Sequence, residues 1–165
     1  DARIGRIRFE TVDLGGLVGA LLDHRAQRLE DPVPVAFARP ADGSVRIHGD
    51  AAQLSRVFDN LLDNALSFSP SGGVVRIGAT ASHGRALVSV DDDGPGIPEV
   101  LRDAVFDRFH SNRPDEAFGQ HSGLGLAIAR AIVEAHGGTI RVEDGPDGRG
   151  TRMVVELPLV EGAGE

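Results

Sequence analysis

The chain has 165 residues, of which 41% are apolar and 25% charged, and its formal net charge is −8. This length and balance predict one compact domain with a sizeable core. A net negative chain offers no basic surface to phosphate backbones or anionic membranes, so we expect neither a nucleic-acid partner nor direct membrane contact. The chain has no cysteine, which excludes disulfides and thiolate-bound zinc.

All seventeen basic residues are arginine, because the sequence contains no lysine. A Walker A loop needs a lysine on the β- and γ-phosphates, protein kinases of the eukaryotic type need a strand lysine, and Schiff-base enzymes need an amine. These three classes of enzyme are therefore excluded.

The first half of the chain predicts two core-facing helices with two short strands between them. Asp13 precedes leucines and valines at helical spacing that fade near residue 30, and Asp50 precedes a longer apolar stripe that ends at Ser69-Pro70. The extended runs 33–38 and 44–48 are bounded by proline and glycine.

The second half predicts a hairpin of strands 74–80 and 85–90, followed by a short helix over 98–106. It then predicts a longer helix over 123–136 and two closing strands, 139–143 and 151–157. The polar stretch 107–122 has few helix or strand signals, and we expect it to be a mobile lid. Strand pairs mixed with packed helices predict an α/β fold, a two-layer sandwich whose mixed, mostly antiparallel sheet carries helices on one face.

Four short segments, in one order along the chain, carry the functional signal: Asn60-Leu-Leu-Asp-Asn64-Ala, Asp93-Gly-Pro-Gly96-Ile, Phe106-Asp-Arg-Phe109 and Ser122-Gly-Leu-Gly-Leu126-Ala. Together with Gly148-Arg-Gly-Thr151 they resemble the boxes of the ATP-binding catalytic domain of bacterial sensor histidine kinases, within the wider gyrase, Hsp90, histidine kinase and MutL group. The resemblance covers about residues 9–159. It implies the Bergerat ATP-binding fold, ATP and Mg²⁺ as ligands, and transfer of the γ-phosphoryl group to a histidine.

The resemblance implies that Asp93 reads the base. A carboxylate at the floor of a pocket accepts a hydrogen bond from the exocyclic amine of adenine and rejects the carbonyl of guanine. Gly94 and Gly96 would let the backbone approach the base, Ile97 would cover its face, and Phe68 would either stack on the nucleotide or join the core. An Asp before Gly can also simply cap a turn.

At the metal and phosphate end, the resemblance makes Asn64 the Mg²⁺ ligand, since its amide oxygen is a hard neutral donor. Asn60 stands where hydrolytic relatives carry a glutamate that activates water. An amide cannot take a proton from the attacking water, so Asn60 favours phosphoryl transfer over hydrolysis and is a catalytic candidate. Ser67 takes a position that often contacts phosphate, while the carboxylates of Asp59 and Asp63 stay unplaced. Asparagines on a helix can also be a solvated edge.

The remaining candidate residues lie on the lid and at the helix that follows it. Arg108 is expected to reach the γ-phosphate as a second catalytic residue, with Arg113 the nearest substitute for a further family arginine. The unpaired amides of a glycine-rich helix start face an anion, so the nucleotide-binding set also includes Ser122, Gly123, Leu124, Gly125, Leu126 and, beyond them, Thr151.

The resemblance also predicts organisation and partners. Residues 1–9 would be the remnant of a preceding dimerisation helix or linker, 10–159 the catalytic domain and 160–165 a tail. The partners would be the dimerisation and phospho-acceptor domain of the same protein and the receiver domain of a response regulator, in the cytoplasm. The amino-acid sequence of residues 109–114 and 118–123 is similar to that of the ChvG/ExoS type of sensor. Two alternatives stay open: an ATP hydrolase of the wider group, and a degenerate module that binds nucleotide or a partner without transfer.

Overall fold

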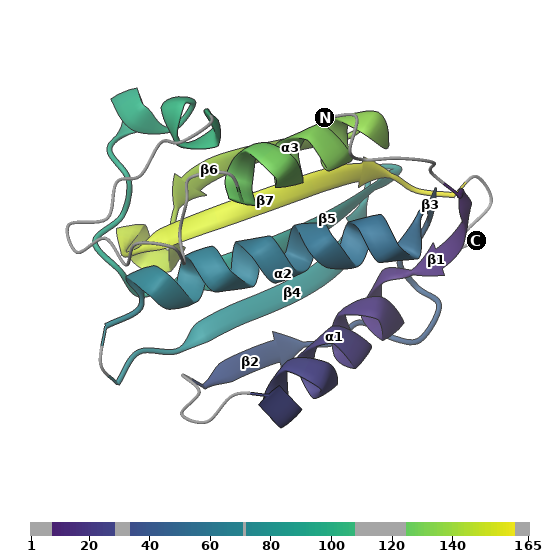
Figure 1. Cartoon of the computed structure of the whole chain (residues 1–165), viewed down its shortest axis with the longest axis horizontal. Coiled ribbons are helices and arrows are strands. Elements are labelled where there is room, and N and C mark those ends of the chain that lie inside the picture. Colours follow the sequence, from purple (N-terminus) through teal and green to yellow (C-terminus); the bar gives the residue numbers. More distant parts are fainter. Residues whose placement is uncertain (1–7, 29–33, 71, 108–124, 161–165) are drawn as a thin grey trace.

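A computed structural model of the chain describes residues 8–28, 34–70, 72–107 and 125–160. It shows a five-stranded sheet with three helices on one face (Figure 1). The strands, in spatial order, are β2 (Val35–Ala38), β4 (Val75–Ser82), β5 (Arg85–Asp92), β7 (Thr151–Pro158) and β6 (Thr139–Asp144). Only the β2 and β4 pair is parallel among these neighbours. The predicted two-layer, mostly antiparallel α/β architecture is confirmed.

The helices are α1 (Leu14–Arg28), α2 (Ala51–Phe68) and α3 (Gly125–Ala135), and α2 lies between the other two (Figure 1). A second, two-stranded sheet pairs β1 (Glu10–Asp13) with β3 (Arg46–Gly49) in antiparallel register. Strand β1 was not predicted. Among the described residues, no helix combines the length and the apolarity needed to cross a membrane.

The helix expected over 98–106 is instead two short 3-10 turns, η2 (Glu99–Leu101) and η3 (Ala104–Phe106). Between them, the guanidinium of Arg102 donates to the carbonyl oxygen of Ile97 at 2.9 Å and binds the carboxylate of Asp144 at 2.6 Å. These contacts tie the segment to the end of β6, and its backbone bonds span three residues in place of the four of an α-helix. A third such turn, η4 (Pro146–Gly148), joins β6 to β7.

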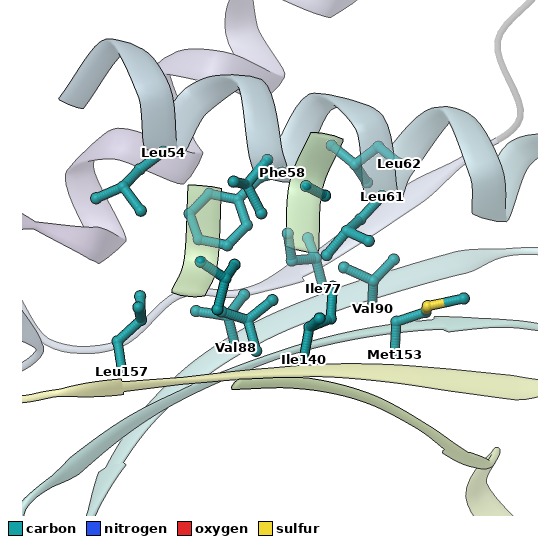
Figure 2. Packing of buried hydrophobic residues seen from close by; sticks show 14 of the residues in the cluster. Leu54, Phe58, Leu61, Leu62, Ile77, Val88, Val90, Ile140, Met153 and Leu157 are labelled. Atoms are coloured by element: carbon teal, nitrogen blue, oxygen red, sulfur yellow. The ribbon is translucent and has the colours of Figure 1, made fainter. Parts of the chain in front are cut away.

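The core lies between α2 and the sheet, because the apolar stripe of α2 points directly at it (Figure 2). Residues of this helix stripe and of the facing strands are almost fully buried, among them Leu54, Phe58, Leu61, Leu62, Ile77, Val88, Val90, Met153 and Leu157. The helical spacing of the first four meets the two-residue alternation of the strands. This contact fixes α2 over the centre of the sheet.

Strand β5 alternates between the two faces of the sheet. Ala86, Val88 and Val90 are buried on the helix-covered side, and the next residue in that series is Asp92, also buried. Asp91 points to the other face, where Arg152 of β7 binds both its oxygens at 2.7 and 2.9 Å. The last inward position of β5 is therefore a carboxylate.

The start of α2 is fixed by Asp50, the N-cap that the sequence predicted. Its Oδ1 accepts the N–H of Gln53 at 3.1 Å, and its Oδ2 accepts the N–H of Arg8 at 2.8 Å. Its own backbone N–H donates to Nε2 of His136 at 3.1 Å. The ring of Phe9 stacks on that imidazole with centroids 5.1 Å apart. Asp50 thus joins the N-terminal segment, the start of α2 and the end of α3.

We expect Asp50→Ala to lower the free energy of unfolding by about 1–2 kcal/mol, because it removes a helix cap and the acceptor for Arg8. Chemical denaturation measures this. The matched control is Asp42→Ala, whose side chain is 89% exposed and whose ion pair with Arg39 is long; it should change the free energy by less than about 0.5 kcal/mol. Equal effects of the two substitutions would contradict the role given to Asp50.

Candidate nucleotide-binding site

Asp92 places a carboxylate in the interior at the end of β5. Asp92 is 2% exposed, and its Oδ1 accepts a hydrogen bond from the backbone N–H of Gly94 at 2.8 Å. Burial raises the pKa of this carboxyl to about 6, and repulsion from Asp93 and Asp91 adds to the increase. The hydrogen bonds from the N–H groups of Gly94 and Thr151 lower the pKa and offset part of this increase. At neutral pH it is an ionised acceptor shielded from water.

Asp93 does not lie where the sequence placed it. Its side chain is 36% exposed, and it binds the N–H of Val74 at 3.1 Å and the guanidinium of Arg76 at 3.2 Å. The Val74 hydrogen bond, followed by that of Arg76, holds the pKa of the Asp93 carboxyl below its ordinary value. The expectation that Asp93 forms a pocket floor is wrong, because this residue lies one position past the strand and ties the start of β4 to the turn.

The sequence contained the signal that distinguishes these neighbours. Along β5 the inward series runs in steps of two through Val88 and Val90, so the next inward residue is Asp92 and not Asp93. Reading that alternation to the end of the strand identifies the buried carboxylate.

The turn after β5 fits tightly between the end of α2 and the start of β7. A Cβ atom on Gly94 would lie 2.7 Å from the carbonyl oxygen of Phe68, and one on Gly150, where φ is +70°, would overlap the carbonyl oxygen of Asp92. Both positions therefore require glycine. The structure brings to this end of the sheet Asp92 and the predicted residues Phe68, Gly94, Gly96, Ile97 and Thr151.

The predicted polar flank of α2 faces α3. Nδ2 of Asn60 donates to the carbonyl oxygen of Gly125, the first residue of α3, at 3.0 Å. Asn64 lies one helical turn further on and is buried, and the hydroxyl of Ser67 donates to its carbonyl oxygen at 2.8 Å. The three side chains share one edge of α2, as their spacing predicted.

The carboxylates that precede these asparagines are held on the α1 side of α2. The guanidinium of Arg25, on α1, binds Asp59 through Nη1 and Asp63 through Nη2, the latter at 2.9 Å. Burial lowers the pKa of Arg25, but the hydrogen bonds and charges of Asp63 and Asp59 outweigh it and the pKa lies above its ordinary value. Asp59 and Asp63 are thus engaged on one flank, while Asn60 contacts α3 on the other.

Several predicted residues lie outside the described part of the chain, namely Arg108, Arg113, Ser122, Gly123 and Leu124. Gly125 and Leu126 begin α3, as part of the helix expected after the lid, and Leu126 packs against the core. Phe106 is buried beneath the guanidinium of Arg130, which lies 5.6 Å from its ring centroid. The described part of the candidate site is therefore the turn after β5 and the α2 flank.

The sheet face that the helices leave uncovered has a hollow of about 540 Å³. Small residues such as Ala36, Ala38 and Gly78 form its floor, and the ion pair of Asp91 with Arg152 lies at its side. Of the predicted site residues that the structure describes, none lines this hollow. Asp92, Asn60 and Asn64 belong to the opposite side of the sheet, so we place the site between α2, α3 and the turn after β5.

The sequence pattern of one family, described as histidine kinase-, DNA gyrase B- and HSP90-like ATPases, matches residues 49–161. The match covers more than half the chain and includes α2, the β5 turn and α3. The chain belongs to this family. Its resemblance to histidine kinase catalytic domains is confirmed.

Within this ATPase family, similar proteins are sensor kinases. The sensor protein ChvG of Rhizobium meliloti (strain 1021) is 40% identical over 170 residues, covering 96% of this chain and 30% of ChvG. The solved mycobacterial sensor histidine kinase MprB is 33% identical with a TM-score of 0.74, over 92% of this chain and 98% of that one. Full-length ShkA in complex with AMPPNP is 28% identical with a TM-score of 0.78, over 96% of this chain and 33% of that one. The chain spans about 30% of the length of the curated relatives it matches.

We expect the Asp92 carboxyl to titrate near pH 6 and that of Asp93 below its ordinary value. Because the pKa of Asp92 is raised by folding, its contribution to stability is present below the unfolded value of 3.8 and is lost as the pH rises through about 6. Carboxyl carbon chemical shifts followed by NMR from about pH 3 to about pH 8 measure both groups. An Asp92 midpoint at the ordinary value would show that the carboxylate is not buried.

Proposed function

We propose that this chain is the ATP-binding catalytic domain of a two-component sensor histidine kinase. It would transfer the γ-phosphoryl group of ATP to a histidine on a dimerisation domain. One observation carries the proposal: a buried carboxylate, Asp92, lies beside a glycine turn at the end of the helix that presents Asn60 and Asn64. Membership of the ATPase family and likeness to sensor kinases support it.

Asp92 takes the base-reading role that the sequence assigned to its neighbour. A carboxylate has about four acceptor sites, and the N–H groups of Gly94 and Thr151 leave others free for an exocyclic amine. Guanine would present a carbonyl oxygen to the same carboxylate, and two acceptors facing each other out of water are strongly unfavourable. Gly94, Gly96 and Ile97 would then line the base.

The α2 flank would meet the triphosphate and its metal ion. The amide oxygen of Asn64 is a hard neutral ligand, and its burial next to the α3 side suits Mg²⁺, which usually takes few protein ligands and keeps phosphate oxygens and waters. When bound, the ion neutralises phosphate charge. Asn64 would hold it, and Asn60, whose amide already donates to Gly125, would position the phosphates together with Ser67.

The same flank favours transfer over hydrolysis. A water-activating base needs a carboxylate or imidazole beside the γ-phosphate, and the amide of Asn60 cannot take a proton at neutral pH. The neighbouring carboxylates Asp59 and Asp63 are bound by Arg25 on the α1 side. This arrangement supports the kinase over the hydrolase alternative.

We propose phosphate-binding roles for the predicted residues that lie outside the described part of the chain. Arg108 would reach the γ-phosphate, with Arg113 as the substitute for a further family arginine, and Ser122, Gly123 and Leu124, which precede α3 in sequence, would present backbone amides to phosphate. The AMPPNP complex of the similar kinase ShkA supports a nucleotide in a domain of this fold.

We propose a dimerisation domain of the same protein and the receiver domain of a response regulator as partners, in the cytoplasm. The similar kinase ThkA, 25% identical over 93% of this chain and 42% of that one with a TM-score of 0.72, is solved in complex with the response regulator protein TrrA. That complex supports the second partner.

We expect Asp92→Asn to weaken binding of an ATP analogue by about 2 kcal/mol, or roughly 30-fold, because an amide presents a donor to the adenine amine. Asp93→Asn is the matched control, since Asp93 is exposed and ion-paired to Arg76; it should change affinity by less than about twofold. Calorimetry with AMP-PNP and Mg²⁺ measures both. A larger loss in the Asp93 variant would return the base-reading role to Asp93.

A transfer assay tests the reaction itself. The chain is mixed with γ-labelled ATP, Mg²⁺ and the separate dimerisation domain of the same protein, and label on protein and in free phosphate is followed. We expect label on a histidine of the added domain, and none when Asn60→Ala replaces the unsubstituted chain. Phosphate release without labelled protein would identify a hydrolase, and nucleotide binding with neither product a binding module.

A further inference from the structure

Arg25 bridges two residues of α2 with one planar group. The Arg25 side chain is 5% exposed, its Nη1 binds Asp59, and its Nη2 binds Asp63 at 2.9 Å. The two carboxylates are four residues apart and therefore stack on one flank of the helix. A rigid fork held at two points one helical turn apart constrains orientation in a way that a single point charge does not.

The rotation of α2 about its own axis is the quantity that such a fork can set. The apolar stripe of α2 sets this rotation coarsely, because hydrophobic burial is non-directional and tolerates small rolls that keep the stripe covered. On the α3 flank, the hydrogen bond of Asn60 to Gly125 is the directional contact described above. The fork on Asp59 and Asp63 supplies the opposing constraint on the α1 flank.

That rotation controls the site because the two pairs of residues are adjacent in sequence. Asn60 directly follows Asp59, and Asn64 directly follows Asp63, so each asparagine lies about 100° around the helix from its acidic neighbour. Any roll of α2 turns both pairs together.

We propose that Arg25 is a positioning residue of the nucleotide site. By holding Asp59 and Asp63, it fixes the rotation of α2 and thereby the direction in which Asn60 and Asn64 face the phosphates and the metal ion. This inference rests on the proposed function and adds to it a residue outside the four sequence motifs, on a helix that carries none of the predicted site residues.

The test is the gain in AMP-PNP affinity that Mg²⁺ produces, measured by calorimetry with Mg²⁺ and with EDTA at a temperature at which circular dichroism shows each variant folded. In Arg25→Met we expect this gain to fall about tenfold, since a small misplacement of a ligand group has effects of that size or larger. Affinity in EDTA should change less than about twofold, because Asp92 holds the base. Loss of packing alone would not lower the Mg²⁺ gain selectively.

Two variants control for charge and for folding. Arg85→Met removes an arginine that is 35% exposed and pairs with Glu156 on the sheet, away from α2, and it should leave the Mg²⁺ gain unchanged. Arg25→Lys keeps the charge but not the fork, so the gain should fall about threefold. If Arg25→Met does not fold, the Arg25→Lys result decides. An unchanged gain in the folded Arg25 variants overturns the inference.

The combined variant Arg25→Met, Asp59→Asn, Asp63→Asn separates geometry from charge. If the two unpaired carboxylates merely repelled the phosphates, neutralising them would restore the Mg²⁺ gain, and that outcome contradicts a positioning role. If the Mg²⁺ gain stays low in the combined variant, the result supports the positioning role of Arg25. Failure of the unsubstituted chain to bind AMP-PNP would instead refute the proposed function, so the two failures are distinguishable.

Discussion

A carboxylate held out of water is the constraint on which the site depends. Burying Asp92 carries a desolvation cost, seen in its pKa near 6, and the N–H groups of Gly94 and Thr151 offset part of it. The Gly94 N–H reaches it from within the turn itself, and the Thr151 N–H reaches it because the start of β7 comes within backbone contact of the turn, which Gly150 permits. In the proposed function, this carboxylate accepts the hydrogen bond of the bound base with its remaining lone pairs.

Helix α2 connects that acceptor to the rest of the domain. Its apolar stripe anchors it to the sheet, Asp50 fixes its start, Arg25 holds one flank, and Asn60 meets α3 on the other. Phe68 closes the helix against the turn that carries Gly94. In the proposed function, the base end and the phosphate end of the site therefore meet on one helix.

Local patterns were enough to predict most of the fold. Helical and alternating periodicities, the Asp50 cap and the glycine turns placed every major helix and strand, whereas β1 was missed because four residues carry too little pattern. Among three consecutive aspartates, the sequence motif alone chose Asp93, and the strand alternation that selects Asp92 was not followed to its end. The Arg25 fork and the His136 bond to Asp50 join residues 34 to 86 positions apart, which periodicity cannot pair.

The most direct measurement of the central claim is a crystal structure of the chain with AMP-PNP and Mg²⁺. The account predicts the exocyclic amine of adenine within hydrogen-bond distance of the Asp92 carboxylate, and the triphosphate running along the Asn60 and Asn64 flank of α2 toward α3. A purine bound at Asp93, or in the hollow on the uncovered face of the sheet, with Asp92 enclosed by protein atoms, would contradict it.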